Sequence, residues 1–125
     1  MKTKVLAILL SVVTLTSLFC ISVSAATATL ESDETYKCTT TISAKGAKAK
    51  IYNAASSKHK VYGYIEYISG GEFVTDKKFL VDKGKTSPWY NSASYFSNNR
   101  SWHLEINPYG ALLTGCTAEG EILSR

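Results

Sequence analysis

The sequence predicts an all-β fold, a small antiparallel two-layer β-sandwich of about seven strands with immunoglobulin-like proportions. From Tyr36 onward the dominant hydrophobic period is two, which is typical of half-buried strands. Turn signals rich in Gly, Ser, Asn and Pro recur about every ten residues, the spacing expected between short strands. No segment shows the 3.6-residue period of an amphipathic helix.

The first 28 residues have the organisation of a secretory signal. Two lysines precede an apolar run over residues 5–19, and small residues fill positions 22–28. We predict a signal peptide over residues 1–25, cleaved after Ala25, with Ala28 as a second site, and therefore a secreted, extracellular protein. The alternative is an uncleaved anchor, because the run approaches the ~20 residues that span a bilayer.

Cleavage after Ala25 leaves 125 − 25 = 100 residues, which suits one small domain. We expect a single sandwich over residues 35–125, preceded by a flexible acidic lead-in over residues 26–34. The mature chain keeps 14 − 2 = 12 basic residues against 10 acidic ones, a net charge of +2. This weak charge gives no reason to expect a nucleic-acid partner.

The predicted strands follow from the alternation of apolar and polar residues between turn signals. A run of three charges at 76–78 is expected to break the fourth strand. The expected strands cover residues 36–44, 47–52, 61–68, 73–81, 89–96, 102–107 and 112–118, and 120–122 adds a short last piece.

The strongest predicted strand is VYGYIEYI, residues 61–68. If Val61, Ile65 and Tyr67 face the core, Tyr62 and Tyr64 lie together on the opposite face. Both faces carry large apolar or aromatic residues, so the choice between them rests on which set is buried.

Two cysteines remain after signal cleavage, and an exported domain with two cysteines is expected to form one disulfide. Cys38 lies in the first predicted strand and Cys116 in the last, and each is predicted on the apolar face. Closing this loop would contribute ~4–5 kcal/mol in the chain-entropy account. The alternatives are two free thiols or a metal pair, although there is no CxxC motif.

Residues 98–110, NNRSWHLEINPYG, place His103 two residues from Glu105. Trp102, Leu104 and Ile106 alternate with them, so both polar side chains are predicted to point to solvent as a weak surface ion pair. No catalytic, metal or phosphate-binding motif is present. Glu119 and Glu121 share a predicted face, as solvated charges near the chain end. We therefore predict no enzyme activity, no catalytic residue, no metal site and no cofactor.

Aromatic and basic residues on polar faces predict a binding role. Every formal charge between Thr35 and Ile65 is positive, which favours an anionic partner or, alternatively, protects edge strands from aggregation. We predict a non-enzymatic module that binds a cell-surface glycan or envelope polymer, because rings stack on sugars and lysines meet anionic groups. The predicted binding residues are Tyr62, Tyr64, Tyr52, Lys48 and Lys50.

The alternative function is a bacteriocin-like or membrane-active secreted toxin that acts on a membrane surface. A weakly basic, aromatic domain closed by a disulfide suits either role. Dye release from anionic vesicles separates the two functions, because a pure binding module leaves vesicles sealed.

Overall fold

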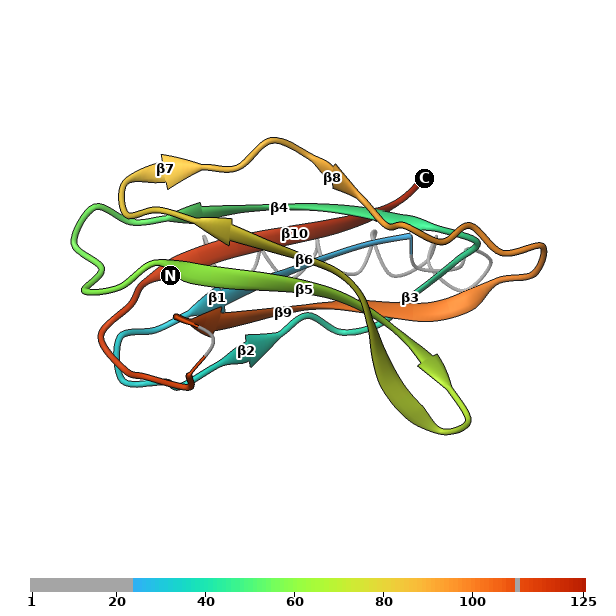
Figure 1. Ribbon diagram of the computed structural model, residues 1–125, viewed down its shortest axis with the longest axis horizontal. Coiled ribbons are helices and arrows are strands. Elements are labelled where there is room, and N and C mark those ends of the chain that lie inside the picture. The colour runs from blue at the N-terminus through green and yellow to red at the C-terminus, as the bar shows by residue number, and fades with distance from the viewer. Residues whose placement is uncertain (1–23, 110) are drawn as a thin grey trace, which may run out of the picture.

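The computed structural model describes residues 24–109 and 111–125. Most of the predicted signal peptide, residues 1–23, therefore lies outside the described residues. The described part of the chain contains ten β-strands and no helix, so it holds no helix that could cross a membrane. The described strands form two sheets that face each other (Figure 1).

All neighbouring strands in both sheets are antiparallel. Sheet 1 has the order β1 (Ala25–Leu30), β10 (Ala118–Ser124), β4 (Ala47–Asn53) and β7 (Lys85–Thr86), with β8 (Tyr90–Asn91) also paired to β4. Sheet 2 has the order β2 (Lys37–Cys38), β9 (Arg100–Pro108), β5 (Val61–Ser69) and β6 (Glu72–Val81), with β3 (Ile42–Ala44) also paired to β9.

The connectivity is that of a jelly roll. The short strands β2 and β3 share one neighbour, as do β7 and β8, so each pair acts as one interrupted strand. On that count the described residues form eight strands in two sheets, and among these strands only β5 and β6 follow each other within one sheet as a hairpin. The predicted two-layer antiparallel sandwich is confirmed. Its connectivity, however, differs from that of an immunoglobulin domain.

The core lies between the sheets and is built from side chains of both. Trp102 is the largest fully buried side chain, and its Nε1–H donates to the Ala44 carbonyl over 2.8 Å. Val61 and Ile65 are also fully buried, and Tyr67 packs against the core. The predicted core face of this strand is therefore confirmed, with Tyr62 and Tyr64 on the outer face of sheet 2.

A glycine lies on the inner face of each sheet where the layers approach closely. A Cβ atom on Gly120 would lie 2.7 Å from Leu104 Cδ2, and one on Gly63 would lie 2.7 Å from Ile51 Cδ1. Glycine avoids these close contacts, which would otherwise require the neighbouring side chains to shift. Glu119 and Glu121, on either side of Gly120, point outward from sheet 1.

The charged run at residues 76–78 does not break β6, which is continuous over Glu72–Val81. Ile65 pairs with Lys77 and Glu66 with Thr75, so Asp76 is the extra residue of a β-bulge. Its carboxylate accepts hydrogen bonds from the backbone N–H groups of residues 93 and 94. These contacts hold residues 92–99 as a loop, and only Tyr90–Asn91 of the predicted strand 89–96 pairs with a neighbour.

Two other predicted segments are wrong at the ends of the domain. The predicted flexible lead-in contains a strand, β1, that pairs along its whole length with β10. Leu30 is fully buried there, while the alternating alanines and threonines before it give only a weak apolar contrast. The predicted strand 112–118 is mostly a loop, and the last strand is instead Ala118–Ser124.

Candidate functional site

The five predicted binding residues lie on opposite sides of the molecule. Lys48, Lys50 and Tyr52 occupy alternate positions of β4 and point outward from sheet 1, because the alanines and isoleucine between them are buried. Tyr62 and Tyr64 point outward from sheet 2. The five residues therefore do not form one continuous surface, since the core separates the two groups.

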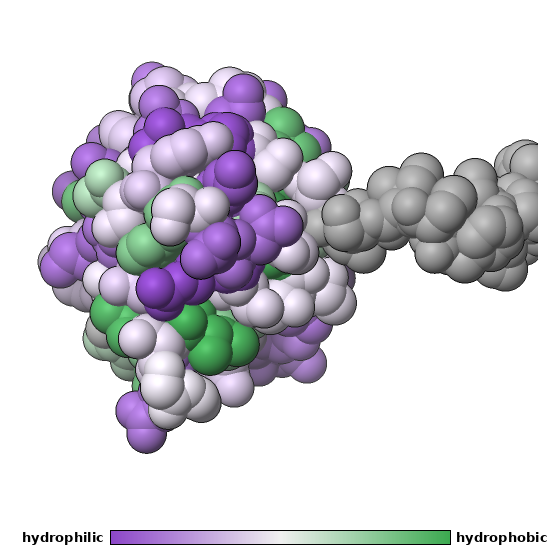
Figure 2. Space-filling model, turned by 90° about the vertical axis from the view of Figure 1, so that its right-hand side faces the viewer, coloured by the Kyte–Doolittle hydropathy of each residue, from purple (hydrophilic) through white to green (hydrophobic). Residues whose placement is uncertain are grey.

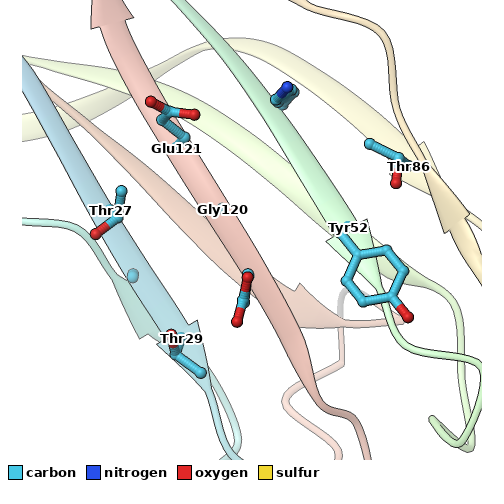
Figure 3. A pocket seen from close by; sticks show the side chains of 9 residues that line it. Thr27, Thr29, Tyr52, Thr86, Gly120 and Glu121 are labelled. Atoms are coloured by element: carbon cyan, nitrogen blue, oxygen red, sulfur yellow. The ribbon is translucent and has the colours of Figure 1, made fainter.

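A groove of about 350 Å³ lies on the outer face of sheet 1. Figure 3 shows labelled side chains of β1, β10, β4 and β7 around it. We call it the sheet 1 groove. Its lining residues are Thr27, Ala28, Thr29, Lys50, Tyr52, Thr86, Glu119, Gly120 and Glu121.

Strand register brings these residues together from distant parts of the sequence. Glu121 lies between Thr27 of β1 and Lys50 of β4 in one row across the sheet. A second, longer row places Thr29, Glu119, Tyr52 and Thr86 side by side on four neighbouring strands. Directly opposed residues of antiparallel strands share one face, so both rows point into the groove.

The lysines beside the groove turn toward an aromatic ring. Lys48 Nζ and Lys50 Nζ lie 5.2 and 4.8 Å from the centroid of Trp89, which is 37% exposed. Such exposed cation–π contacts contribute about 0.5–1 kcal/mol each. Lys50 lies opposite Glu121 in register, yet within the described ranges neither Glu119 nor Glu121 forms an ion pair. The groove therefore keeps two carboxylates without a cationic partner.

Tyr52 is the aromatic residue of the groove, and 43% of its surface is exposed. In the described part of the chain, the side chains of Tyr52 and of the threonines and glutamates that line the groove form no hydrogen bond. An exposed ring beside hydroxyl and carboxylate groups offers both a stacking surface and hydrogen-bonding partners to a ligand.

A second hollow of about 460 Å³ lies beside β6 and β7. Its lining includes Lys60 and Asp82, which pair with each other over 3.6 Å, and the partly covered ring of Tyr90. Because Asp82 is already paired with Lys60 and the Tyr90 ring is partly covered, this hollow is a weaker candidate than the sheet 1 groove.

The outer face of sheet 2 carries the other predicted tyrosines. The rings of Tyr62 and Tyr64 are half-buried, with centroids 6.0 Å apart, and Lys78 Nζ lies 5.1 Å from the Tyr62 centroid. Burial, followed by the nearby Glu105 carboxylate, raises the pKa of Tyr64. Both rings are thus partly covered by neighbours, in contrast to Tyr52.

The predicted surface ion pair between His103 and Glu105 is wrong, because His103 is buried and contacts a different carboxylate. His103 is on the outer face as expected, but it is only 7% exposed. Its Nε2 lies 2.8 Å from Glu66 Oε1, and its ring stacks on Phe73 with centroids 3.6 Å apart. Glu105 instead accepts a hydrogen bond from Asn107 Nδ2 over 3.0 Å.

The cover over His103 comes from the end of the β5–β6 hairpin, which leaves the sandwich in Figure 1. The turn Gly70–Gly71 has positive φ at both residues, 63° and 83°, as a two-residue hairpin turn of type I′ requires. Figure 2 shows a hydrophobic patch low on this end of the molecule, and Phe73 and Val74 of the hairpin are each 40% exposed. The hairpin shields His103 in a structural contact away from the groove.

We expect the Glu66–His103 contact to make stability depend on pH. The hydrogen bond with His103, and then that with Thr75, lowers the pKa of Glu66 below its ordinary 4.5. A carboxyl with a lowered pKa in the folded state contributes stability above its unfolded pKa and loses it as the pH falls through the folded value. Glu66→Gln should therefore show a smaller fall in unfolding free energy between neutral and acid pH, measured by urea titration.

The matched control is Glu72→Gln, an exposed carboxylate at the end of the same hairpin. Its acid-induced loss of stability should equal that of the wild type. An unchanged pH dependence in Glu66→Gln would show that the contact with His103 adds nothing to folding.

The predicted disulfide between Cys38 and Cys116 is not formed, and both thiols are free. The alternation of buried residues shifts between β2 and β3. In β3 the even-numbered residues Ile42 and Ala44 are buried, whereas next to β2 the odd-numbered Thr39 is buried. Cys38 consequently lies on the outer face of sheet 2 opposite Glu105, whereas Cys116 is in the core. Burial and the nearby carboxylates raise the pKa of the Cys38 thiol to about 11.

No metal site follows from the described residues, which contain no group of three or more potential ligands. Four residues that were not predicted to bind a ligand also belong to the groove or its rim. They are Thr27, Thr29, Thr86 and Trp89. Their membership depends on the pairing of β1, β10, β4 and β7. No local pattern in the sequence specifies that pairing.

No known family model matches the chain, and no curated protein sequence matches it. Among solved structures, the crystal structure of PirA is similar with a TM-score of 0.51 and 14% identity, over 82% of this chain and 94% of that one. The Yersinia pseudotuberculosis-derived mitogen is similar with a TM-score of 0.51 and 14% identity, over 84% of this chain and 88% of that one. At this identity the likeness shows the β-sandwich fold alone.

Proposed function

We propose that the protein is a secreted, non-enzymatic binding module that holds a glycan of a cell surface or envelope polymer in the sheet 1 groove. The observation that carries this proposal is the exposed Tyr52 ring within a groove of unpaired hydroxyl and carboxylate groups. Sugar rings stack on aromatic side chains through their C–H faces, while their hydroxyls need hydrogen-bonding partners at the edges.

The groove supplies both kinds of contact on a rigid support. Its residues lie on paired strands of one sheet, so their positions are fixed by the ladder hydrogen bonds. Trp89 extends the aromatic surface beyond Lys50 at one side. A ligand can therefore bind without the loop ordering that lowers affinity.

Retention on insoluble cellulose, mannan, chitin and isolated bacterial cell-wall material tests the proposal. We expect at least one of these materials to deplete the protein from solution in a saturable way. The assay is repeated with Tyr52→Ala, which should stay in solution. Retention of this variant would identify adsorption that does not depend on Tyr52. Absence of saturable retention on every material would contradict the proposed function.

Secretion remains part of the proposal, and β1 provides a test of the cleavage site. Cleavage after Ala25 leaves five of the six residues of β1, Ala26–Leu30, paired with β10, whereas cleavage after Ala28 leaves only two. Leu30 at the end of this strand is fully buried. We therefore expect N-terminal sequencing of the secreted protein to begin at Ala26. A start at Thr29 would show that most of β1 is dispensable.

A second candidate function is the membrane-active toxin, and one observation favours it. The loop between β9 and β10 exposes three large apolar residues, Tyr109, Leu112 and Leu113, of which Tyr109 and Leu112 have positive φ. Such strained, exposed apolar residues are more common at functional sites than elsewhere. Dye release from anionic vesicles that is lost in Leu112→Ser with Leu113→Ser would support this function over glycan binding.

A further inference from the structure

The sheet 1 groove crosses the strands, and its longer row of side chains contains one residue from each of four strands. Thr29 of β1 and Thr86 of β7 lie at the two ends of this row, with Glu119 and Tyr52 between them. Neighbouring strands are ~4.8 Å apart, so the row spans about 14 Å. Figure 3 shows Thr29, Tyr52 and Thr86 on the separate strands that supply them. The contact surface is thus longer than a single sugar ring.

The charges in the groove are segregated. Glu119 and Glu121 project from β10 in the middle of the sheet. Lys50, the one cation among the described residues that line the groove, leans toward Trp89 at the side. Several other carboxylates in the described ranges have partners, among them Glu34 with Lys37, Asp82 with Lys60, and Asp76 with Ser94. The middle of the groove therefore presents hydrogen-bond acceptors and negative charge.

We infer that the sheet 1 groove binds an extended glycan chain without negative charge, laid across the strands, and that Glu119 and Glu121 exclude acidic polymers. This inference rests on the proposed function and specifies its ligand class. It replaces the anionic partner suggested by the lysine-rich sequence, because the middle of the groove carries the carboxylates of Glu119 and Glu121, while Lys50 lies over Trp89 at the side.

The chemistry of the two carboxylates supports the binding of neutral glycans over acidic ones. An ionised carboxylate only accepts hydrogen bonds, and sugar hydroxyls can donate to it. Hydrogen bonds to a charged acceptor are shorter and stronger than those between neutral groups. A uronate or phosphate group at the same position would bring like charges together and offer no donor in return.

Oligosaccharide binding in solution tests the charge selection. The probes are neutral oligomers of glucose, mannose and N-acetylglucosamine, together with glucuronate and mannuronate oligomers that match the first two in backbone. We expect the wild type to bind a neutral series at least about tenfold more tightly than either acidic series. Glu119→Gln with Glu121→Gln should reduce this difference, because it removes the charge and keeps the side-chain shape.

The control variant is Asp33→Asn with Glu72→Gln, which makes the same change in net charge at exposed positions outside the groove. It should discriminate between neutral and acidic oligomers as the wild type does. Equal loss of discrimination in both double variants would assign the effect to overall charge and overturn the inference.

Oligosaccharides of increasing length test whether the ligand lies across the strands. Affinity should rise from the monosaccharide until the oligomer spans the row from Thr29 to Thr86, and then level off. In Thr86→Ala this rise should end at a shorter oligomer, while the shortest ones that bind keep their wild-type affinity. A monosaccharide that binds as tightly as the longest oligomer would overturn the extended-chain geometry.

The outcomes separate this inference from the proposed function. If cell-wall or glycan material retains the protein through Tyr52, but acidic oligomers bind as tightly as neutral ones, only the inference fails. Retention on cell-wall material with no binding of any neutral oligomer also overturns the inference alone. Absence of all retention and all oligomer binding overturns both.

Discussion

Replacing Ile65 with alanine is expected to lower the free energy of unfolding by about 2–5 kcal/mol. Ile65 is fully buried on β5, between Leu104 of β9 and Lys77 of β6 in the register of sheet 2. The substitution removes buried apolar surface and leaves a cavity that the two packed sheets close only in part. Urea denaturation, followed by tryptophan fluorescence that includes the buried Trp102, measures the change.

The matched controls are Tyr62→Ala and Tyr64→Ala, on the outer face of the same strand. Both rings are only half-buried, so each truncation should cost much less stability than Ile65→Ala. If the tyrosine variants unfold as readily as Ile65→Ala, the outer face of sheet 2 contributes to folding as a second core.

Replacing Tyr52 with alanine is expected to weaken glycan binding by about 30-fold or more, the scale of a binding hot spot near 2 kcal/mol. The ring is the aromatic surface of the sheet 1 groove and is exposed rather than part of the core. The midpoint of thermal unfolding should therefore stay close to that of the wild type. Titration calorimetry with the tightest neutral oligomer, combined with thermal unfolding, checks both results.

Tyr36→Ala is the matched control for this prediction. Tyr36 is more exposed than Tyr52 and precedes β2, outside the groove lining, so its removal should leave binding unchanged. The double variant Tyr62→Ala with Tyr64→Ala should also bind normally, because both rings lie on sheet 2. Loss of binding in that double variant would move the site to the opposite face.

The strands are predicted correctly where alternate side chains differ strongly in hydrophobicity. The prediction is wrong where this difference is small. The alternation of β5 places fully buried Val61 and Ile65 opposite two tyrosines, so the choice of face is correct. In β1 the alternation is between alanine and threonine, and only Leu30 marks the buried side strongly. Leu112 and Leu113 resemble a strand core, but they are exposed in a loop that contains a positive φ at Leu112.

The candidate site is predictable along one strand and not across the sheet. A period of two is enough to place Lys48, Lys50 and Tyr52 on a common outward face. Their neighbours Glu119 and Glu121 enter the groove through the register of β4 with β10, which depends on the complete jelly-roll connectivity. The disulfide prediction is wrong for a related reason, because the break between β2 and β3 changes which residues face the core.

Ligand binding on the outer face of sheet 1 is tested most directly by amide chemical-shift mapping. The isotope-labelled protein is titrated with the tightest neutral oligomer, and shift changes are followed residue by residue. The largest changes should occur in segments 27–29, 50–52 and 119–121, which line the groove. Largest changes around Tyr62 and Tyr64 on the opposite sheet, or in the apolar loop after β9, would contradict it.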